Sequence, residues 1–172
     1  MRSLELVVFS TFIVTIAKES NPINRLIWVP RGRKNGTREE RGMLGSMNIV
    51  AFVPTKDSGK ARTFYEGVLG LRFVKDDGFA LLLDANGIMV RVAKVPDFKP
   101  AQFTILGWEV TDIEKIATAL GAKGVHFERF GFFEQDKLGI WTAPTGDKVA
   151  WFKDPDGNVL SVSQHVEGRG IE

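Results

Sequence analysis

A pattern of short apolar runs and helical stripes begins at residue 47 and occurs twice. In its first occurrence, the partly β-branched run at 48–54 predicts a strand. Apolar residues with helical spacing then recur between 61 and 69, which predicts an amphipathic helix. We expect Asp57 to cap this helix at its N-terminus and Gly70 to end it.

Three short apolar runs follow this helix and predict strands at 71–75, 79–83 and 88–92. The turns between them are Asp77-Gly78 and Asn86-Gly87. Both pairs favour hairpins, because their residues tolerate the positive φ angles that two-residue turns need.

The same order of elements recurs in the second half of the chain. A strand is predicted at 103–110, and an apolar stripe within 113–120 predicts a second helix. Thr111 and Glu114 have the spacing of a capping box at its start, and Gly121 and Gly124 are expected to end it. Further strands are predicted at 125–130, 139–143, 148–153 and 159–164. The last two turns are Thr145-Gly146-Asp147 and Asp156-Gly157.

The repeat indicates an α+β fold of two βαβββ modules, at about 47–98 and 102–165. Each helix has one apolar stripe, so each should cover one face of its own strands. We therefore divide the chain into a leader at 1–46, one domain at 47–166 and a tail at 167–172.

Composition limits the chemistry that this domain can perform. The chain of 172 residues contains no cysteine and two histidines, His126 and His165. Disulfides, thiolate metal sites and cysteine nucleophiles are therefore excluded. The net charge of +2 is uneven, because the leader carries +4 and the remainder −2. The domain has no basic stripe with interleaved aromatic residues, so we expect no nucleic-acid partner.

The leader admits three interpretations. It contains an apolar run at 4–17 that is interrupted by Glu5, followed by a charged stretch at 31–42. Translation could begin at Met43 or Met47 instead of Met1, the leader could be a genuine flexible or membrane-facing anchor, or it could be a secretion signal. For residues 47–172 we expect no membrane association and a cytoplasmic location, in a bacterial protein.

Two motifs resemble those of the vicinal oxygen chelate superfamily, which includes glyoxalases, bleomycin-resistance proteins and extradiol dioxygenases. The first is Lys60-Ala61-x-x-Phe64-Tyr65-x-x-Val68-Leu69-Gly70-Leu71, in the first helix. The second is Phe152-x-Asp154-Pro155-Asp156-Gly157-Asn158, in the last hairpin. The resemblance implies that the two modules form a curved, cup-shaped mixed sheet with the helices outside. It also implies a homodimer.

In the enzymes of that superfamily, four strands supply ligands to a divalent metal in the cup. The matching positions here are Val50, Ile105, Ser161 and, within one residue, Arg91. Valine and isoleucine have no lone pair, a lone serine is a poor ligand, and arginine would repel a cation. We therefore predict no metal and no other cofactor, and we do not carry over the chemistry that depends on the metal.

Alternation along the strands then predicts a mostly apolar cup with a few polar groups, which is typical of a small-molecule site. The candidate ligand-binding residues are Val50, Phe52, Met89, Arg91, Phe103, Ile105, Glu109, Phe133, Trp141, Ser161 and Ser163. Ile88, Val90 and Val92 should instead pack against the helix.

Several of these residues have two interpretations. Arg91 either binds an anionic group of the ligand, or it pairs with Glu109 or reaches solvent. The segment with Phe130, Phe132 and Phe133 is either a lid or a satellite of the core. Trp108 is expected to pack in the core under the helix, and His126 is expected to face solvent or to have its hydrogen bonds satisfied within the fold. Ser163 and His165 share one face of the last strand, but no orienting acid is evident beside them.

These observations favour a metal-free protein that binds a small apolar or aromatic molecule carrying an anionic group. The alternative is a metal-dependent lyase or dioxygenase with relocated ligands such as Glu109, Asp136 and His165. A third hypothesis is an interaction subunit whose cup is vestigial. No residue in the sequence identifies the ligand, and catalytic residues cannot be assigned.

Overall fold

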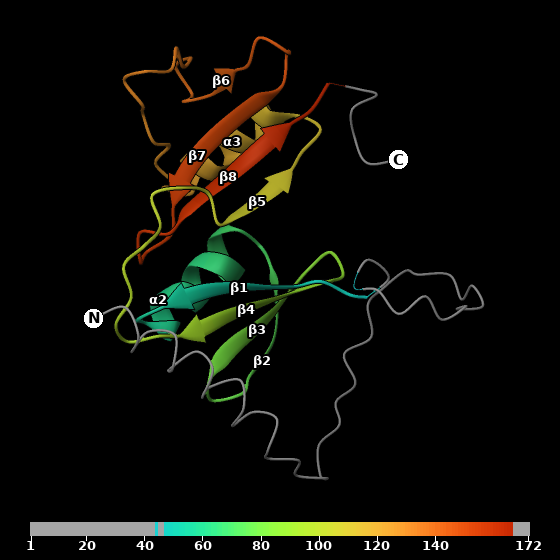
Figure 1. The fold of residues 1–172 in the computed structure, drawn as a ribbon, viewed down its shortest axis with the longest axis vertical. Coiled ribbons are helices and arrows are strands. Elements are labelled where there is room, and N and C mark those ends of the chain that lie inside the picture. The colour runs from blue at the N-terminus through green and yellow to red at the C-terminus, as the bar shows by residue number, and fades with distance from the viewer. Residues whose placement is uncertain (1–43, 45–46, 167–172) are drawn as a thin grey trace, which may run out of the picture. The chain divides into compact units, whose positions relative to one another are not determined.

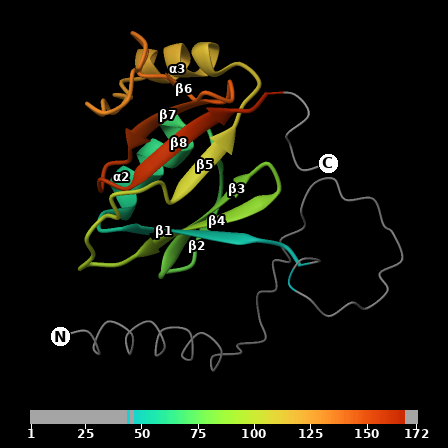
Figure 2. The same cartoon turned by 45° about the horizontal axis from the view of Figure 1, so that its top comes forward.

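The computed structural model describes residue 44 and residues 47–166 (Figures 1 and 2). Apart from residue 44, the predicted leader lies outside the described residues, and so does the predicted tail at 167–172. The three interpretations of the leader therefore stay predictions.

The first module contains four strands that form sheet A. Its elements are β1 (Val50–Thr55), α2 (Ser58–Arg62), the π-helix η2 (Thr63–Val68), β2 (Arg72–Asp76), β3 (Ala80–Ala85) and β4 (Ile88–Lys94). The strand order is β1-β4-β3-β2, with β1 and β4 parallel and the other pairs antiparallel. The predicted hairpin at 86–87 is confirmed: Asn86 and Gly87 have φ angles of 51° and 90°. Two positive φ angles give the turn a twist that matches the flanking strands.

The first helix changes type partway along its length. Asp57 caps it as predicted, because its side chain accepts a hydrogen bond from the Lys60 amide. After Arg62 the helix continues as η2, whose wider turn is shown by the Leu69 amide donating to the carbonyl of Phe64, five residues earlier. The predicted apolar stripe still faces inward, since Tyr65 is completely buried and its neighbours pack against the core.

The second module repeats this arrangement as sheet B. Its elements are β5 (Leu106–Glu109), α3 (Ile113–Ala122), β6 (Trp141–Thr142), β7 (Lys148–Lys153) and β8 (Val159–Gln164). The strand order is β5-β8-β7-β6, and β5 is parallel to β8. The two α+β modules predicted from the sequence are therefore present, each with its helix packed on one sheet.

Three local predictions in this module were wrong. Asp112, not Thr111, caps α3 by accepting a hydrogen bond from the Lys115 amide; its carboxylate is the better acceptor at a positive helix end. The strand predicted at 103–110 begins only at residue 106. The strands predicted at 125–130 and 139–143 are reduced to one bridge, between Phe127 and Phe152, and the two-residue β6.

Side chains replace the missing strand ladder between 128 and 140. The Arg129 guanidinium donates to the carbonyls of Asp136 and Lys137. The side-chain oxygen of Gln135 accepts a hydrogen bond from the backbone amide of Phe130. Its side-chain nitrogen donates to the carbonyls of residues 128 and 139. These bonds satisfy backbone groups that a strand partner would otherwise satisfy, so the segment folds as a loop against sheet B.

The core lies between the helices and the helix-facing sides of the two sheets. Its central residues are fully buried, including Val53, Val90, Ala150 and Leu160. Val90 and Val92 pack on the helix-facing side as predicted, but Ile88, at the start of β4 on the same side, does not, since it is 47% exposed. None of the helices in the described part of the chain is long and apolar enough to cross a membrane.

Candidate functional site

Each sheet has one face covered by its helix and one face opposite, which we call the open face. Paired residues on neighbouring strands project to the same side, so the register defines which side chains share the open face. On sheet A, Arg91 pairs with Leu82 and with Phe52, and Leu82 pairs in turn with Lys75. We call these four residues the Arg91 row. The next row contains Val50, Met89, Asp84 and Arg72.

Arg91 has a partner that the sequence analysis did not foresee. Its guanidinium lies 2.6 Å from the carboxylate of Asp77, and both side chains are about one fifth exposed, at 20% and 22%. It also lies 5.9 Å from the ring centre of Phe52. The expected pairing of Arg91 with Glu109 was therefore wrong. Arg91 remains on the open face, but most of its charge is balanced by Asp77.

Asp77 is held in the charged form by its surroundings. Desolvation on its own would raise the pKa of Asp77, but hydrogen bonds from the Ala80 amide, the Arg91 guanidinium and the Phe79 amide outweigh it and lower the pKa. Lys75, in the same row, is exposed and forms no ion pair with any residue that the structure describes. The Arg91 row therefore has an excess of positive charge.

On the open face of sheet B, Gly107 leaves space for the side chain of Ser161. Gly107 on β5 pairs with Ser161 on β8, which pairs with Trp151 on β7; we call these three residues the Ser161 row. A Cβ atom at position 107 would lie only 2.7 Å from Ser161 Oγ. The parallel row contains Glu109, Ser163, Val149 and Trp141.

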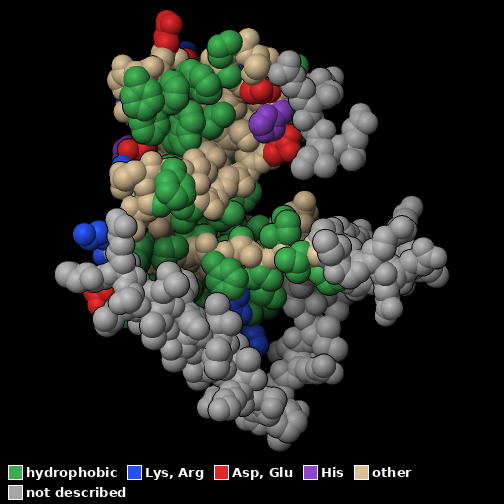
Figure 3. Space-filling model, viewed as in Figure 1, with side chains coloured by type: hydrophobic (Ala, Val, Ile, Leu, Met, Phe, Trp, Pro, Cys, Tyr) green, Lys and Arg blue, Asp and Glu red, His purple; other side chains and the backbone are tan. Residues whose placement is uncertain are grey.

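Aromatic rings cover the β6 and β7 side of this open face (Figure 3). The ring of Phe133 stacks on Trp151 with the planes at 3° and the centres 5.6 Å apart, and its centre is 4.6 Å from that of Trp141. Phe130 meets Trp151 edge to face. With Phe132, which is 77% exposed, these residues form what we call the aromatic cluster: Phe130, Phe132, Phe133, Trp141 and Trp151.

The aromatic cluster lies beside a buried hydroxyl group. Ser161 is 8% exposed, and no residue in the described part of the chain hydrogen-bonds its Oγ atom. An unpaired buried hydroxyl costs roughly 1–3 kcal/mol, so such groups usually have a water or a ligand as partner. The Ser161 row thus offers a polar group at the edge of an aromatic surface.

The other predicted site residues lie in less favourable places. Ile105 precedes β5 and packs against the core, and Phe103, before it, is 69% exposed. Val50 and Phe52 are exposed at 40% and 62% on the open face of sheet A. Trp108 packs against the core and His126 is exposed, as predicted. The segment at 130–133 packs on the open face of sheet B itself.

Two predictions about chemistry also need correction. An acid does lie beside His165: its Nδ1 is 3.6 Å from the Asp147 carboxylate, while its Nε2 is 3.4 Å from Ser163 Oγ. The relocated ligands Glu109, Asp136 and His165 do not assemble, since no three acidic or histidine residues within the described residues could jointly hold a metal. The Asp136 carboxylate is instead used by the amides of Leu138 and Ile140.

The positions that hold metal in the resembling enzymes do not fit one here. Ser161 is paired with Gly107, and Val50 is paired with Met89. The carboxylate in the Val50 row, Asp84, forms an ion pair with Arg72 at 2.9 Å. Arg91, beside Met89 on β4, brings a positive charge. The donor set is therefore unsuited to a divalent ion, and no reaction step is assigned to one.

Comparison with known proteins decides the family. The sequence model of the Glyoxalase/Bleomycin resistance protein/Dioxygenase superfamily matches residues 47–162. The chain belongs to this superfamily. None of the curated proteins compared with it matches. Among solved structures, it is similar to a glyoxalase/bleomycin resistance protein/dioxygenase from Alicyclobacillus acidocaldarius, with 16% identity, 74% of this chain and 97% of the other covered, and a TM-score of 0.57.

Two other solved structures have similar values. A member of the Glyoxalase/bleomycin resistance protein/dioxygenase superfamily from Sphaerobacter thermophilus is 21% identical over 70% of this chain and 98% of its own, with a TM-score of 0.56. Lactoylglutathione lyase from Agrobacterium tumefaciens is 18% identical over 69% of this chain and 93% of its own, with a TM-score of 0.54. Identities this low establish a common fold, and they leave the function of this glyoxalase-superfamily chain to its own residues.

The second of the two resembling motifs, at 152–158, has a structural role here. The carboxylate of Asp154 is buried and accepts four hydrogen bonds: from the Tyr65 hydroxyl, the Asn158 side chain, and the amides of residues 156 and 158. Asn158 also donates to the Pro54 carbonyl, and Asp156 accepts from Thr55 at 2.5 Å. We call this network the inter-module clasp, because it joins the last hairpin to β1 and η2.

Proposed function

We propose that this protein binds a small aromatic molecule with an anionic group on its open faces, without a metal. The observation that carries the proposal is the aromatic cluster beside the buried, unpartnered hydroxyl of Ser161. Phe132 is exposed and the other four rings are only partly buried, and apolar patches left open on a protein surface often mark binding sites. Binding sites for small molecules typically combine such apolar surfaces with a few polar groups.

The aromatic part of the ligand is assigned to sheet B. Phe133 and Trp151 are already stacked, and Phe132 leaves most of its surface accessible. A further ring that packs offset or edge-on against them would gain about 0.5–1.5 kcal/mol per aromatic pair beyond the area it buries. Ser161 Oγ would supply the hydrogen bond that orients the ligand.

We assign the anionic group to the Arg91 row on the premise, implied by the superfamily resemblance, that the open faces of both sheets line one cup. Asp77 balances Arg91, and Lys75 adds a second positive charge that no described carboxylate neutralises. A carboxylate on the ligand would therefore meet a net positive surface, in which Lys75 acts as a point charge. Because Lys75 is exposed, we expect its contribution to weaken at high salt.

The experiment compares two probes that differ in charge. Isothermal titration with 2-naphthoate and with 2-naphthalenemethanol measures both affinities on the full chain. Phe133→Ala should weaken both probes about fivefold, as expected for the loss of one aromatic contact. Lys75→Ala should weaken the naphthoate only. Phe98→Ala and Lys137→Ala are the matched controls, since neither residue belongs to the rows or to the aromatic cluster.

Two results would contradict the proposal. One is that neither probe binds the wild-type protein. The other is that Phe133→Ala and Phe98→Ala have equal effects, which would place the aromatic contact elsewhere. The homodimer and the cytoplasmic location stay predictions; native mass spectrometry of the purified protein tests the first.

A further inference from the structure

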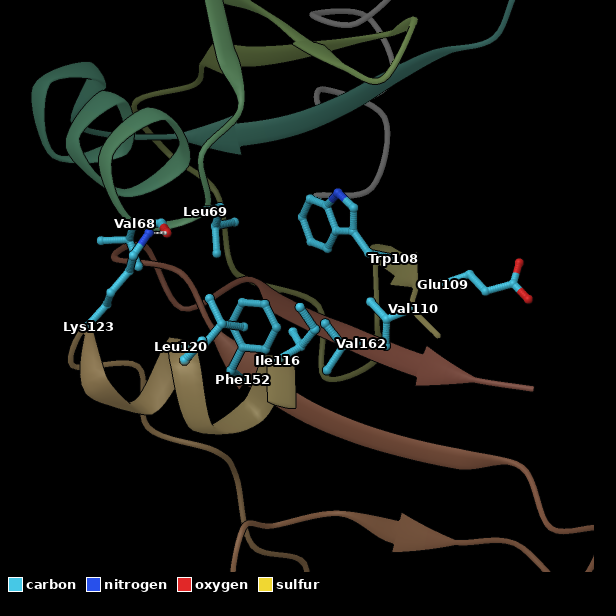
Figure 4. Close-up of a pocket in the computed structure, with 11 residues that line it drawn as sticks. Val68, Leu69, Trp108, Glu109, Val110, Ile116, Leu120, Lys123, Phe152 and Val162 are labelled. Atoms are coloured by element: carbon cyan, nitrogen blue, oxygen red, sulfur yellow. Dashed lines mark hydrogen bonds between the residues drawn. The ribbon is translucent and has the colours of Figure 1, made fainter. Parts of the chain in front are cut away.

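An apolar cavity lies on the opposite side of sheet B from the aromatic cluster. It has a volume of about 320 Å³ and is lined by side chains from η2, β5, α3, β7 and β8. Figure 4 shows Ile116, Leu120 and Phe152 on one side of it and Leu69 and Trp108 on the other. Its volume is at the small end of the ~300–1,000 Å³ that small-molecule sites occupy.

One end of this cavity carries a positive charge. Figure 4 shows Lys123 at one end, whereas the Glu109 side chain at the other end points away from the apolar lining. The Lys123 ammonium donates to the Val68 carbonyl at 2.8 Å. That bond uses one of its three donors and fixes the charged group at the mouth of the cavity. Among the described residues, no carboxylate forms an ion pair with Lys123.

The cavity wall includes the end of the π-helix. Val68 is the last residue of η2 and Leu69 is its C-cap. The carbonyl that receives the Lys123 hydrogen bond is therefore one of the last in the helix. π-helical turns are rare and recur at functional sites, which distinguishes this wall from an ordinary gap in packing.

We propose that this cavity is a second binding site, for a medium-chain aliphatic carboxylate. The aliphatic chain would lie along the apolar lining and contact Trp108, while the carboxylate would bind Lys123. Lys123 sets the direction, because the other side chains that point into the cavity are apolar. The ligand class differs from the one assigned to the open faces, since most side chains that line this cavity are aliphatic, with Phe152 and Trp108 as its two aromatic residues.

The test uses decanoate and its uncharged analogue decanol as probes of the full-length protein. Binding is followed by the NMR signal of the Trp108 indole N–H, which is assigned through the Trp108→Phe variant. We expect both probes to shift this signal. Lys123→Ala should weaken decanoate about tenfold and leave decanol unchanged, because it removes only a charge-assisted contact.

Two further variants locate the site. Ala119 lies exposed on α3 at the cavity, so Ala119→Phe should fill the cavity and weaken both probes without disturbing the core. Lys115→Ala, on the same helix but outside the lining, should weaken neither. Phe133→Ala should also leave decanoate binding unchanged, which separates this site from the open face of sheet B.

Three results would overturn the inference. They are the absence of a shift at Trp108, equal decanoate affinity in Lys123→Ala and wild type, and unaltered binding in Ala119→Phe. Thermal melting of each variant confirms that a loss of binding does not come from unfolding. Loss of decanoate binding in Phe133→Ala would instead place the carboxylate on the open face.

Discussion

Replacing Tyr65 by phenylalanine tests the inter-module clasp. Tyr65 is 0% exposed, and its hydroxyl donates to the Asp154 carboxylate at 2.8 Å. Phenylalanine keeps the ring and its contacts with Phe64, so the substitution removes one hydrogen bond and little else. Hydrogen bonds to charged groups contribute about 1.5–3 kcal/mol, and Asp154 keeps three other donors. We therefore expect the free energy of unfolding to fall by about 2 kcal/mol.

The same hydrogen bond predicts an unusual alkaline titration. Burial, the charge of Asp154 and the hydrogen bond to it raise the pKa of the Tyr65 hydroxyl far above its usual 10.0. Because the pKa is higher in the folded chain than in the unfolded chain, this stabilisation is complete below pH 10. It is lost as the pH rises further, since the unfolded chain releases the proton first.

Two assays measure these effects. Urea unfolding at pH 7, followed by tryptophan fluorescence, gives the difference in free energy between the wild type and Tyr65→Phe. Absorbance at 295 nm reports tyrosinate directly, because Tyr65 is the single tyrosine of the chain. Tyrosinate should form only when the protein unfolds. Equal unfolding free energies, or tyrosinate forming near pH 10 while the protein stays folded, would refute the reasoning.

Three further substitutions test local features by urea unfolding. Gly107→Ala places a Cβ 2.7 Å from Ser161 Oγ and should lower the free energy of unfolding by about 1–3 kcal/mol. Adding Ser161→Ala to the same chain should restore most of this loss, and no recovery would disprove the close contact. Asp77→Asn should cost about 1–2 kcal/mol at pH 7. Because the pKa of Asp77 is lowered from 3.8, that cost should shrink as the pH falls below this value, and a cost independent of pH would contradict the assignment. Gly87→Ala forces alanine to a φ of 90° and should cost about 1–2 kcal/mol; an unchanged stability would argue against the hairpin turn.

Regular elements with strong periodicity could be predicted from the sequence. The strand at 159–164 has the bounds predicted for it, and the stripe of α3 faces the core. These elements bury one face, so apolar spacing alone determines them. The prediction failed at 125–130, because Arg129 and Gln135 satisfy backbone groups that a neighbouring strand would have satisfied. Apolar periodicity does not show such hydrogen bonds between side chains and the backbone.

The candidate site could be predicted only in part. Alternation correctly placed Met89 and Arg91 opposite the core-facing Val90, but it could not identify Asp77 as the partner of Arg91. Asp77 was interpreted only as a residue of the turn between β2 and β3. Its side chain also reaches Arg91 on β4. No role was assigned to Trp151 from the sequence, because its stack with Phe133 depends on how the loop at 129–140 folds.

The most direct test of the account is the affinity for 2-naphthoate before and after metal removal. Full-length protein is titrated calorimetrically as purified, after exhaustive treatment with EDTA, and after a divalent metal is added back. The account predicts one affinity in all three states, because the open faces bind the ligand through aromatic rings, Ser161 and positive side chains. Loss of binding after chelation, with recovery when the metal is restored, would contradict it.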